Sequence, residues 1–220
     1  MALKRRSEQQ SSSNVEYSNL PEGEHEGRLV YVADLGLQKR DYMGDEKPPA
    51  QQISLGIEIV GESVTIDGEE RPRLLWTRPF YIYGAMSERG KEYQFYKVFD
   101  PTAKEGEYAD WDGVLNVPCN VIVKHMPNKQ NPEQVYDNID TITPIPKKYQ
   151  SGVDEARLTD MCVGDADNPE NPAQKATFGL AAYALGNRIM EEDANTENPK
   201  ENTSKPEPVA QDDMEDEIPW

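Results

Sequence analysis

The sequence predicts a mainly β domain followed by an acidic tail, and three observations support this prediction. Apolar and polar residues alternate over several short segments of the first 150 residues, as in β-strands with one buried face. Only 36% of residues are hydrophobic and the mean hydropathy is -0.83, so part of the chain is expected to be disordered. The negative charge is concentrated late in the chain, because residues 151–220 carry a net charge of -12 and residues 1–150 carry -6.

A chain of 220 residues has room for one domain of ordinary size with tails on either side. Pro169 and Pro172 interrupt the segment after the β domain, and the Ala- and Leu-rich stretch at 173–190 has apolar residues near helical spacing. We therefore expect a flexible N-terminal arm over residues 1–20, a β domain over 21–150, a helical extension over 151–190 and a disordered acidic tail over 191–220.

Five strands and one helix are expected in the β domain. In the first strand, after Gly27, Leu29, Tyr31, Ala33 and Leu35 alternate with Arg28, Val30, Val32 and Asp34. The second strand is the clearest half-buried one, with Ile53, Leu55, Ile57 and Ile59 facing one way. The third strand covers 74–83, the helix covers 87–99 with Ser87 as its N-cap and Asp100-Pro101 as its end, and the last two strands cover 119–123 and 136–145.

Five strands with a helix between the third and the fourth is the chain order of the OB-fold, a small, partly open barrel that binds oligonucleotides. The longer polar connections are expected at 39–50 and at 127–134. In an OB-fold, these two loops flank the binding face. The sequence therefore predicts an OB-fold-like, five-stranded barrel, with an unrelated small β-sandwich as the alternative.

The chain ends in a group of acids followed by Ile218, Pro219 and Trp220. A large aromatic residue in an otherwise solvated segment is suited to anchor in a partner's pocket lined with Arg or Lys. The expected partner-binding residues are Asp216, Glu217, Ile218, Pro219 and Trp220. This tip resembles the C-terminal tip of bacterial single-stranded DNA-binding proteins, with Trp220 in place of the Phe of that family. A tail that serves only solubility is the alternative.

The body, over roughly residues 20–147, resembles phage single-stranded DNA-binding proteins. The likeness lies in the opening strand at 22–30, the Asp-Glu-Lys-Pro-Pro stretch at 45–49 and the helix that ends in Asp100-Pro101. The resemblance implies sequence-independent binding and protection of single-stranded DNA during phage replication or recombination. It also implies recruitment of replication proteins by the tail, in the cytoplasm of an infected bacterial host.

Binding a single strand requires aromatic faces that stack on bases and cations that follow the phosphates. Both are frequent between residues 39 and 97, and strict alternation in the third strand places Trp76, Arg78 and Phe80 on one face and Tyr81 on the other. The alternative for each aromatic residue is a place in the core. The predicted DNA-binding residues are Lys39, Arg40, Tyr42, Lys47, Arg71, Arg73, Trp76, Arg78, Phe80, Lys124 and Lys129.

The sequence lacks the common catalytic signatures, including the Gly-x-x-x-x-Gly-Lys phosphate loop and the Gly-x-Ser-x-Gly elbow. His25 and His125 have no Cys or acidic partner at metal-ligand spacing. We therefore expect no enzymatic activity, no cofactor and no metal. One alternative is a metal-dependent nuclease that uses Asp34, Asp41 and Glu58, and another is a phage interaction or structural protein that does not bind nucleic acid.

The two cysteines, Cys119 and Cys162, lie far apart in the sequence and do not suggest a disulfide framework, which suits a reducing cytoplasm. No apolar run approaches the length of a membrane span, and the basic start of the chain leads into Ser and Gln residues. We therefore expect neither a membrane partner nor a signal peptide. The sequence does not predict the oligomeric state.

Overall fold

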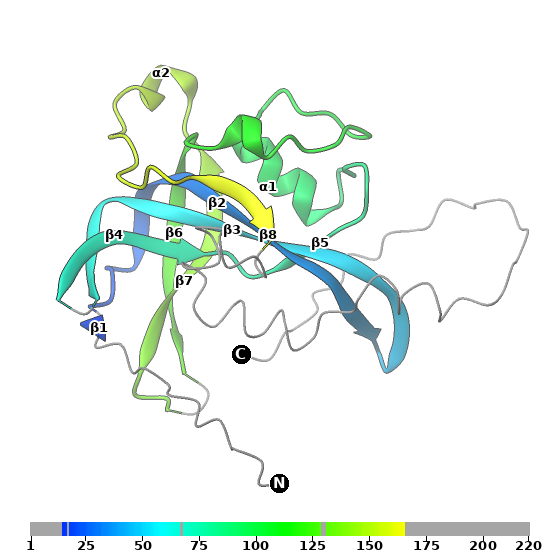
Figure 1. The fold of residues 1–220 in the computed structure, drawn as a ribbon, viewed down its shortest axis with the longest axis horizontal. Helices are drawn as coiled ribbons and strands as arrows, with labels where there is room; N and C mark the ends of the chain where they lie inside the picture. The colour runs from blue at the N-terminus through cyan, green and yellow to red at the C-terminus, as the bar shows by residue number, and fades with distance from the viewer. Residues whose placement is uncertain (1–14, 17, 67, 129–130, 166–220) are drawn as a thin grey trace, which may run out of the picture.

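An eight-stranded, largely antiparallel sheet forms most of the computed structural model, which describes residues 15–16, 18–66, 68–128 and 131–165 (Figure 1). The strands are β1 Val15–Glu16, β2 Gly23–Tyr42, β3 Asp45–Ile66, β4 Glu69–Trp76, β5 Phe80–Ile82, β6 Pro118–Pro127, β7 Val135–Pro144 and β8 Cys162–Asp165. The helices are α1 Lys91–Phe99, the 3-10 helix η1 Asp112–Val114 and α2 Lys147–Gln150. The prediction of a mainly β protein is confirmed.

The two longest strands, β2 and β3, pair with each other and organise the sheet. Strand β3 also pairs with β1, β4 and β5, while β2 pairs with β6 and, in parallel, with β8. Strand β6 pairs with β7. In the described residues no backbone ladder joins β4 to β7, so the hydrogen-bonded sheet stays open and the closed form of the predicted barrel is not confirmed.

Side chains bridge the gap between β4 and β7. Arg73 of β4 forms an ion pair with Asp137 of β7, and the two side chains are 2% and 0% exposed. The backbone N–H of Leu20 also donates to Asp137, at 3.1 Å, and the ring of His125 lies 3.5 Å from the same carboxylate. The two strands are therefore held together here by a buried ion pair in place of backbone hydrogen bonds.

The main hydrophobic core lies on the inner face of β3, where Ile53, Leu55, Ile57 and Ile59 are at most 3% exposed. The predicted alternation of this strand is confirmed, but the strand is not half-buried. Its outer-face residues Gln52, Ser54 and Glu58 are also at most 2% exposed. Because buried polar groups need hydrogen-bond partners, Ser54 donates to the carbonyl of Thr77 at 2.8 Å.

A β-bulge corrects the predicted alternation of the first strand. The register of β2 against β3 shifts between Leu29 and Tyr31, so one extra residue is inserted in β2. Leu29 and Val32 therefore pack in the main core, whereas Tyr31, Ala33 and Leu35 belong to clusters outside it. A bulge moves every following side chain to the other face, so strict alternation could not place these residues.

The polar stretch predicted as a loop over 39–50 is instead the far end of a long β-hairpin. Tyr42 pairs with Asp45, and only Met43 and Gly44 lie between the two strands. Both turn residues have positive φ, 52° and 86°, which is typical of the type I′ turn that joins the two strands of a hairpin with a two-residue loop. In Figure 1 this hairpin and the β6–β7 hairpin extend away from the side of the sheet that carries α1.

The predicted third strand is divided into β4 and β5. Thr77, Arg78 and Pro79 interrupt it, and the N–H of Thr77 donates to the carbonyl of Leu55 at 2.9 Å. The expected helix begins at Lys91, four residues later than predicted, and Ser87 is not its N-cap. It ends at Phe99, before Asp100-Pro101 as expected. Tyr93, Tyr96 and Phe99 of α1 cover the core.

Residues 153–165, here called the strap, cross the outer face of the sheet and end in β8. Two buried charged side chains bind the strap backbone. Arg28 donates to the carbonyls of Val153 and Asp154 at 2.9 and 2.8 Å, and Glu58 accepts from the N–H groups of Arg157 and Leu158 at 2.8 and 3.0 Å. The described part of the predicted helical extension is therefore extended chain rather than helix.

The remaining predictions about chain organisation lie outside the described residues. These are most of the N-terminal arm, the helix expected over 173–190 and the acidic tail over 191–220. Among the described helices, none has the length and apolar composition needed to cross a bilayer.

Candidate nucleic-acid interface

Two tyrosines and an arginine form a cluster on the outer side of the sheet. The rings of Tyr81 and Tyr83 are stacked, with centroids 6.2 Å apart and planes at 29°. The guanidinium carbon of Arg40 lies 5.0 Å from the centroid of Tyr81 and 4.9 Å from that of Tyr83. Tyr83 is 45% exposed. We call these three residues the Arg–Tyr cluster.

The short strand β5 sets the direction of the two tyrosines. Phe80 and Ile82 point into the main core, and Phe80 packs against Phe95 of α1 with ring centroids 4.9 Å apart. Because successive side chains of a strand point to opposite faces, Tyr81 lies on the outer face. Its hydroxyl donates to the carbonyl of Lys39 at 3.2 Å, which ties β5 to the β2–β3 hairpin.

The cation of the cluster has no acidic partner among the described residues. Arg40 forms no ion pair there, and its Nε–H is buried without a hydrogen-bond partner. The exposed side chains of Lys39 and Arg78 are likewise unpaired with any described carboxylate. Lys47, which is half-buried, is the cross-strand neighbour of Arg40. Aromatic faces and cations thus gather at this end of β3.

Three other predicted cations are neutralised by acids. Arg73 is buried in its ion pair with Asp137. Arg71 pairs with Glu69 at 2.9 Å, and Lys124 pairs with Asp140 at 2.9 Å. Arg71 also lies at the opposite end of β3 from the cluster, because its cross-strand neighbour is Val64. The structure therefore does not combine the whole predicted set into one basic groove.

Two predicted stacking residues are used for packing. Phe80 is 2% exposed, and its burial argues against contact with a base. Trp76 is half-buried and lies parallel to Tyr31, with ring centroids 6.2 Å apart and planes at 12°. Apolar residues of the strap, including Leu158 and Met161, cover this pair. For Phe80 the structure supports the alternative of a core aromatic residue.

The remaining predicted residues cannot be assigned a place. The backbone of Tyr42 belongs to β2, but its side chain is outside the described part of the structure, as is Lys129. The whole proposed partner-binding tip, residues 216–220, also lies outside the described residues.

The sequence contained a signal for Tyr81 and Tyr83 that strict alternation concealed. Both belong to the predicted third strand, but strict alternation puts Tyr81 on the face opposite to Trp76, whereas in the structure Tyr81 and Trp76 both lie on the outer face. Pro79 marks the interruption, because a proline cannot donate to a strand ladder and is excluded from the middle of a sheet. When β5 is treated as a separate strand, the burial of Phe80 alone places Tyr81 on the outer face.

The carboxylates of the nuclease alternative already have structural partners. Glu58 binds the strap, and Asp34 accepts from the N–H of Gly36 at 2.8 Å and from the amide of Gln51 at 2.7 Å. The side chain of Asp41 is not described. Within the described ranges, no group of three or more His, Cys, Asp and Glu side chains is arranged to hold a metal ion.

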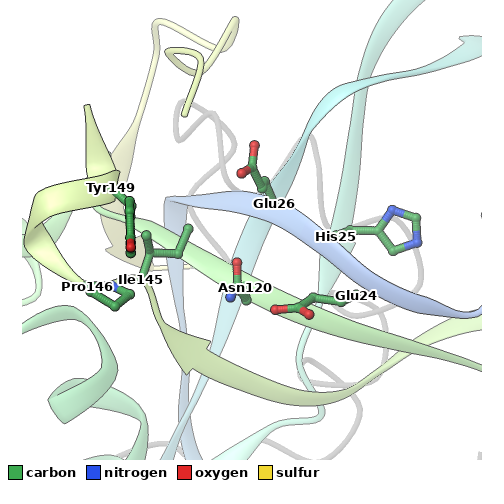
Figure 2. A pocket seen from close by; sticks show the side chains of 7 residues that line it. All are labelled: Glu24, His25, Glu26, Asn120, Ile145, Pro146 and Tyr149. Carbon is green, nitrogen blue, oxygen red and sulfur yellow. The ribbon is translucent and has the colours of Figure 1, made fainter. Parts of the chain in front are cut away.

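A pocket of about 410 Å³ lies near the start of β2, and Figure 2 shows the side chains that line it. The pocket combines two acids on β2 with an apolar side next to α2. Its lining residues are Glu24, His25, Glu26, Asn120, Ile145, Pro146 and Tyr149. Because Glu24 and Glu26 are exposed acids, they repel phosphates, and the pocket does not extend the candidate nucleic-acid interface.

The chain matches no known family model, no curated protein and no solved structure. The function is therefore inferred from the residues and their geometry.

Proposed function

We propose that this protein binds single-stranded DNA without sequence preference and protects it during phage replication or recombination. The observation that carries the proposal is the Arg–Tyr cluster, in which a guanidinium without an acidic partner among the described residues lies over two stacked, partly exposed tyrosine rings. Aromatic faces stack on bases of any identity, and arginine supplies both a phosphate contact and a cation–π contact. The cluster thus holds both elements of sequence-independent binding.

The strand connections support an OB-fold-like arrangement for the domain. The long strand β2 corresponds to the first strand of such a fold, and it pairs with β3 on one side and β6 on the other. Strand β3 also pairs with β4, and β6 pairs with β7. In chain order, α1 follows β5 and precedes β6. The buried pair of Arg73 and Asp137 brings β4 and β7 together where a barrel would close. In such a fold the face that binds oligonucleotides lies beside the hairpin of the first two strands.

The cluster lies at that hairpin. Tyr81 is hydrogen-bonded to the backbone of β2, and Arg40 belongs to the same strand. Since the guanidinium of Arg40 lies against two rings, less of its side-chain freedom remains to be lost when it contacts a phosphate. We infer that two bases stack beside Tyr83 and Tyr81, while Arg40, Lys39 and Arg78 contact the phosphates.

The acidic tail adds a second activity to the proposal. Its terminal Trp220 and Ile218 would fill a pocket on a replication or recombination protein, and the preceding acids would meet the cations around that pocket. A tethered polyanion is also present at a high effective concentration near the DNA-binding cations, so it would compete with DNA at low salt.

The test of the proposal is a titration of labelled single-stranded and double-stranded oligonucleotides at two salt concentrations. We expect single-strand binding that weakens as salt rises, because phosphate contacts release counterions. Tyr83→Ala is expected to weaken it by about 1–3 kcal/mol through the loss of stacking. Arg40→Ala is expected to weaken it and to reduce the salt slope by about one.

Two substitutions serve as matched controls. Arg71→Ala removes an exposed arginine that is already paired with Glu69, and Tyr108→Ala removes a tyrosine that is 77% exposed on a different loop. Both variants are expected to bind like the unchanged protein. Failure of the folded, unchanged protein to bind single strands at low salt would refute the function and favour the interaction or structural role. Strand cleavage on addition of Mg²⁺ would favour the nuclease.

A further inference from the structure

The tip of the β2–β3 hairpin carries an unusual residue. Met43 adopts φ of 52°, in the left-handed region that L-residues other than Gly, Asn and Asp seldom occupy. The first position of a type I′ turn is normally Asn, Asp or Gly for this reason. Gly44, at the second position, fits the rule. The turn therefore carries backbone strain at Met43 that the usual turn residues would avoid.

Packing does not offset this strain. Met43 is 84% exposed, the most exposed of the large hydrophobic residues in the described chain. An asparagine or glycine would suit the turn better and would remove apolar surface from water. Strained residues that contribute little to the fold are found where they contact ligands.

The neighbouring charges indicate what the tip contacts. Lys39, Arg40 and Lys47 lie nearer the body, on the same two strands of the hairpin. The residues next to the turn include the exposed acids Asp45 and Glu46. These acids repel phosphates, so the tip is poorly suited to bind the backbone of a nucleic acid. The remaining partner for an apolar tip beside a phosphate-binding region is the face of a base.

We propose that Met43 is an apolar wedge that contacts and unstacks bases of the bound single strand, next to the phosphates held by the Arg–Tyr cluster. This inference rests on the proposed DNA-binding function and assigns a separate task to the hairpin tip. Proteins that distort nucleic acids commonly insert Met, Leu, Ile or Phe between bases in this way. Loss of the wedge should change base stacking more than it changes the ionic part of binding.

The experiment uses the full chain and a single-stranded oligonucleotide that contains 2-aminopurine, whose fluorescence rises when its base is unstacked. At saturating unchanged protein, we expect a clear increase. With Met43→Asn we expect less than half of that increase, an affinity about fivefold weaker and an unchanged salt slope. Met43→Leu keeps the apolar side chain and should retain most of the increase.

Two controls test whether Met43→Asn disturbs the fold and whether loss of any exposed methionine has the same effect. Asparagine is favoured at this turn position, so Met43→Asn should unfold at an equal or higher temperature than the unchanged protein. Met126→Asn removes another exposed methionine, from the β6–β7 hairpin, and should leave the fluorescence increase intact. If Met43→Asn matches the unchanged protein in fluorescence and affinity, the wedge is refuted while the DNA-binding function stands.

Two further results would also overturn the wedge. A reduced salt slope in Met43→Asn would mean that the tip contacts phosphates. Absence of single-strand binding by the unchanged protein would refute both the wedge and the proposed function. If a partner protein bound the unchanged chain but not Met43→Asn, and the fluorescence increase stayed the same, the tip would be a protein contact instead.

Discussion

A buried acid in α1 is expected to make the stability of the fold depend on pH. Glu92 is 7% exposed, in the first turn of the helix. Burial raises the pKa of Glu92 from its ordinary value of 4.5 to about 6, and the nearby indole of Trp111 opposes part of that rise. The folded protein therefore holds this proton more tightly than the unfolded chain does.

The sign and size of the effect follow from that difference. Below a pH of about 4.5, Glu92 is protonated in both states and carries no ionisation penalty. As pH rises from about 4.5 to 6, the unfolded chain loses the proton first and the free energy of unfolding falls. A difference of about 1.5 pH units corresponds to roughly 2 kcal/mol, which is the full penalty above pH 6.

Glu92→Gln removes the ionisable group while keeping the shape of the side chain. In urea unfolding followed by circular dichroism, we expect this variant to be more stable than the unchanged protein by up to about 2 kcal/mol at pH 7.5. At pH 4 the two should be nearly equal. Glu88→Gln, at an exposed position just before the helix, is the control for the loss of one negative charge. An equal Glu92→Gln effect at both pH values would refute the reasoning.

Two further predictions concern the buried ion pair and the tail. Arg73→Ala should lower the free energy of unfolding by about 3–5 kcal/mol, because Asp137 is left buried without its cation. The double variant Arg73→Met, Asp137→Leu should recover most of this loss in the same urea assay, and an equal loss in both would contradict the argument. Deleting residues 191–220 removes 11 acids and 2 lysines, a change of +9 in net charge, and should tighten single-strand binding at low salt. Trp220→Ala should abolish partner capture and leave DNA affinity unchanged, whereas a deletion that binds DNA equally or more weakly would exclude competition by the tail.

The sequence predicted the features of the fold that depend on local apolar patterns. The alternation around Ile57 and the helix that ends at Phe99 both follow from spacings of a few residues, and both are present. The outer face of β3 was not predictable in this way, because its cover comes from a segment about 100 residues later. The hydrogen bond from the N–H of Leu158 to Glu58 cannot be predicted from the apolar and polar residues near Glu58 in the sequence.

The candidate site was predicted in part for the same reason. Arg40, Lys39 and Arg78 were identified by residue type, and the structure leaves them without acidic partners in the described residues. Arg73 has the same residue type but lies opposite Asp137, a partner 64 residues away. Whether a cation is available to phosphate is decided by such long-range pairing, which composition does not reveal.

The strap explains why the smaller of two aromatic pairs is the better candidate for stacking on bases. Tyr31 and Trp76 form the larger parallel pair on the outer face, but residues of the strap pack over it, and the hydroxyl of Tyr31 donates to Asp160 at 2.6 Å. In the described chain the strap extends along β2 as far as Asp34, whose neighbour on β3 is Ile53. Tyr81 lies opposite the next residue, Gln52, so the Arg–Tyr cluster begins where the described strap ends. Within the described residues, the strap therefore covers the part of the outer face that holds Tyr31 and Trp76, and it ends before the part that holds the Arg–Tyr cluster.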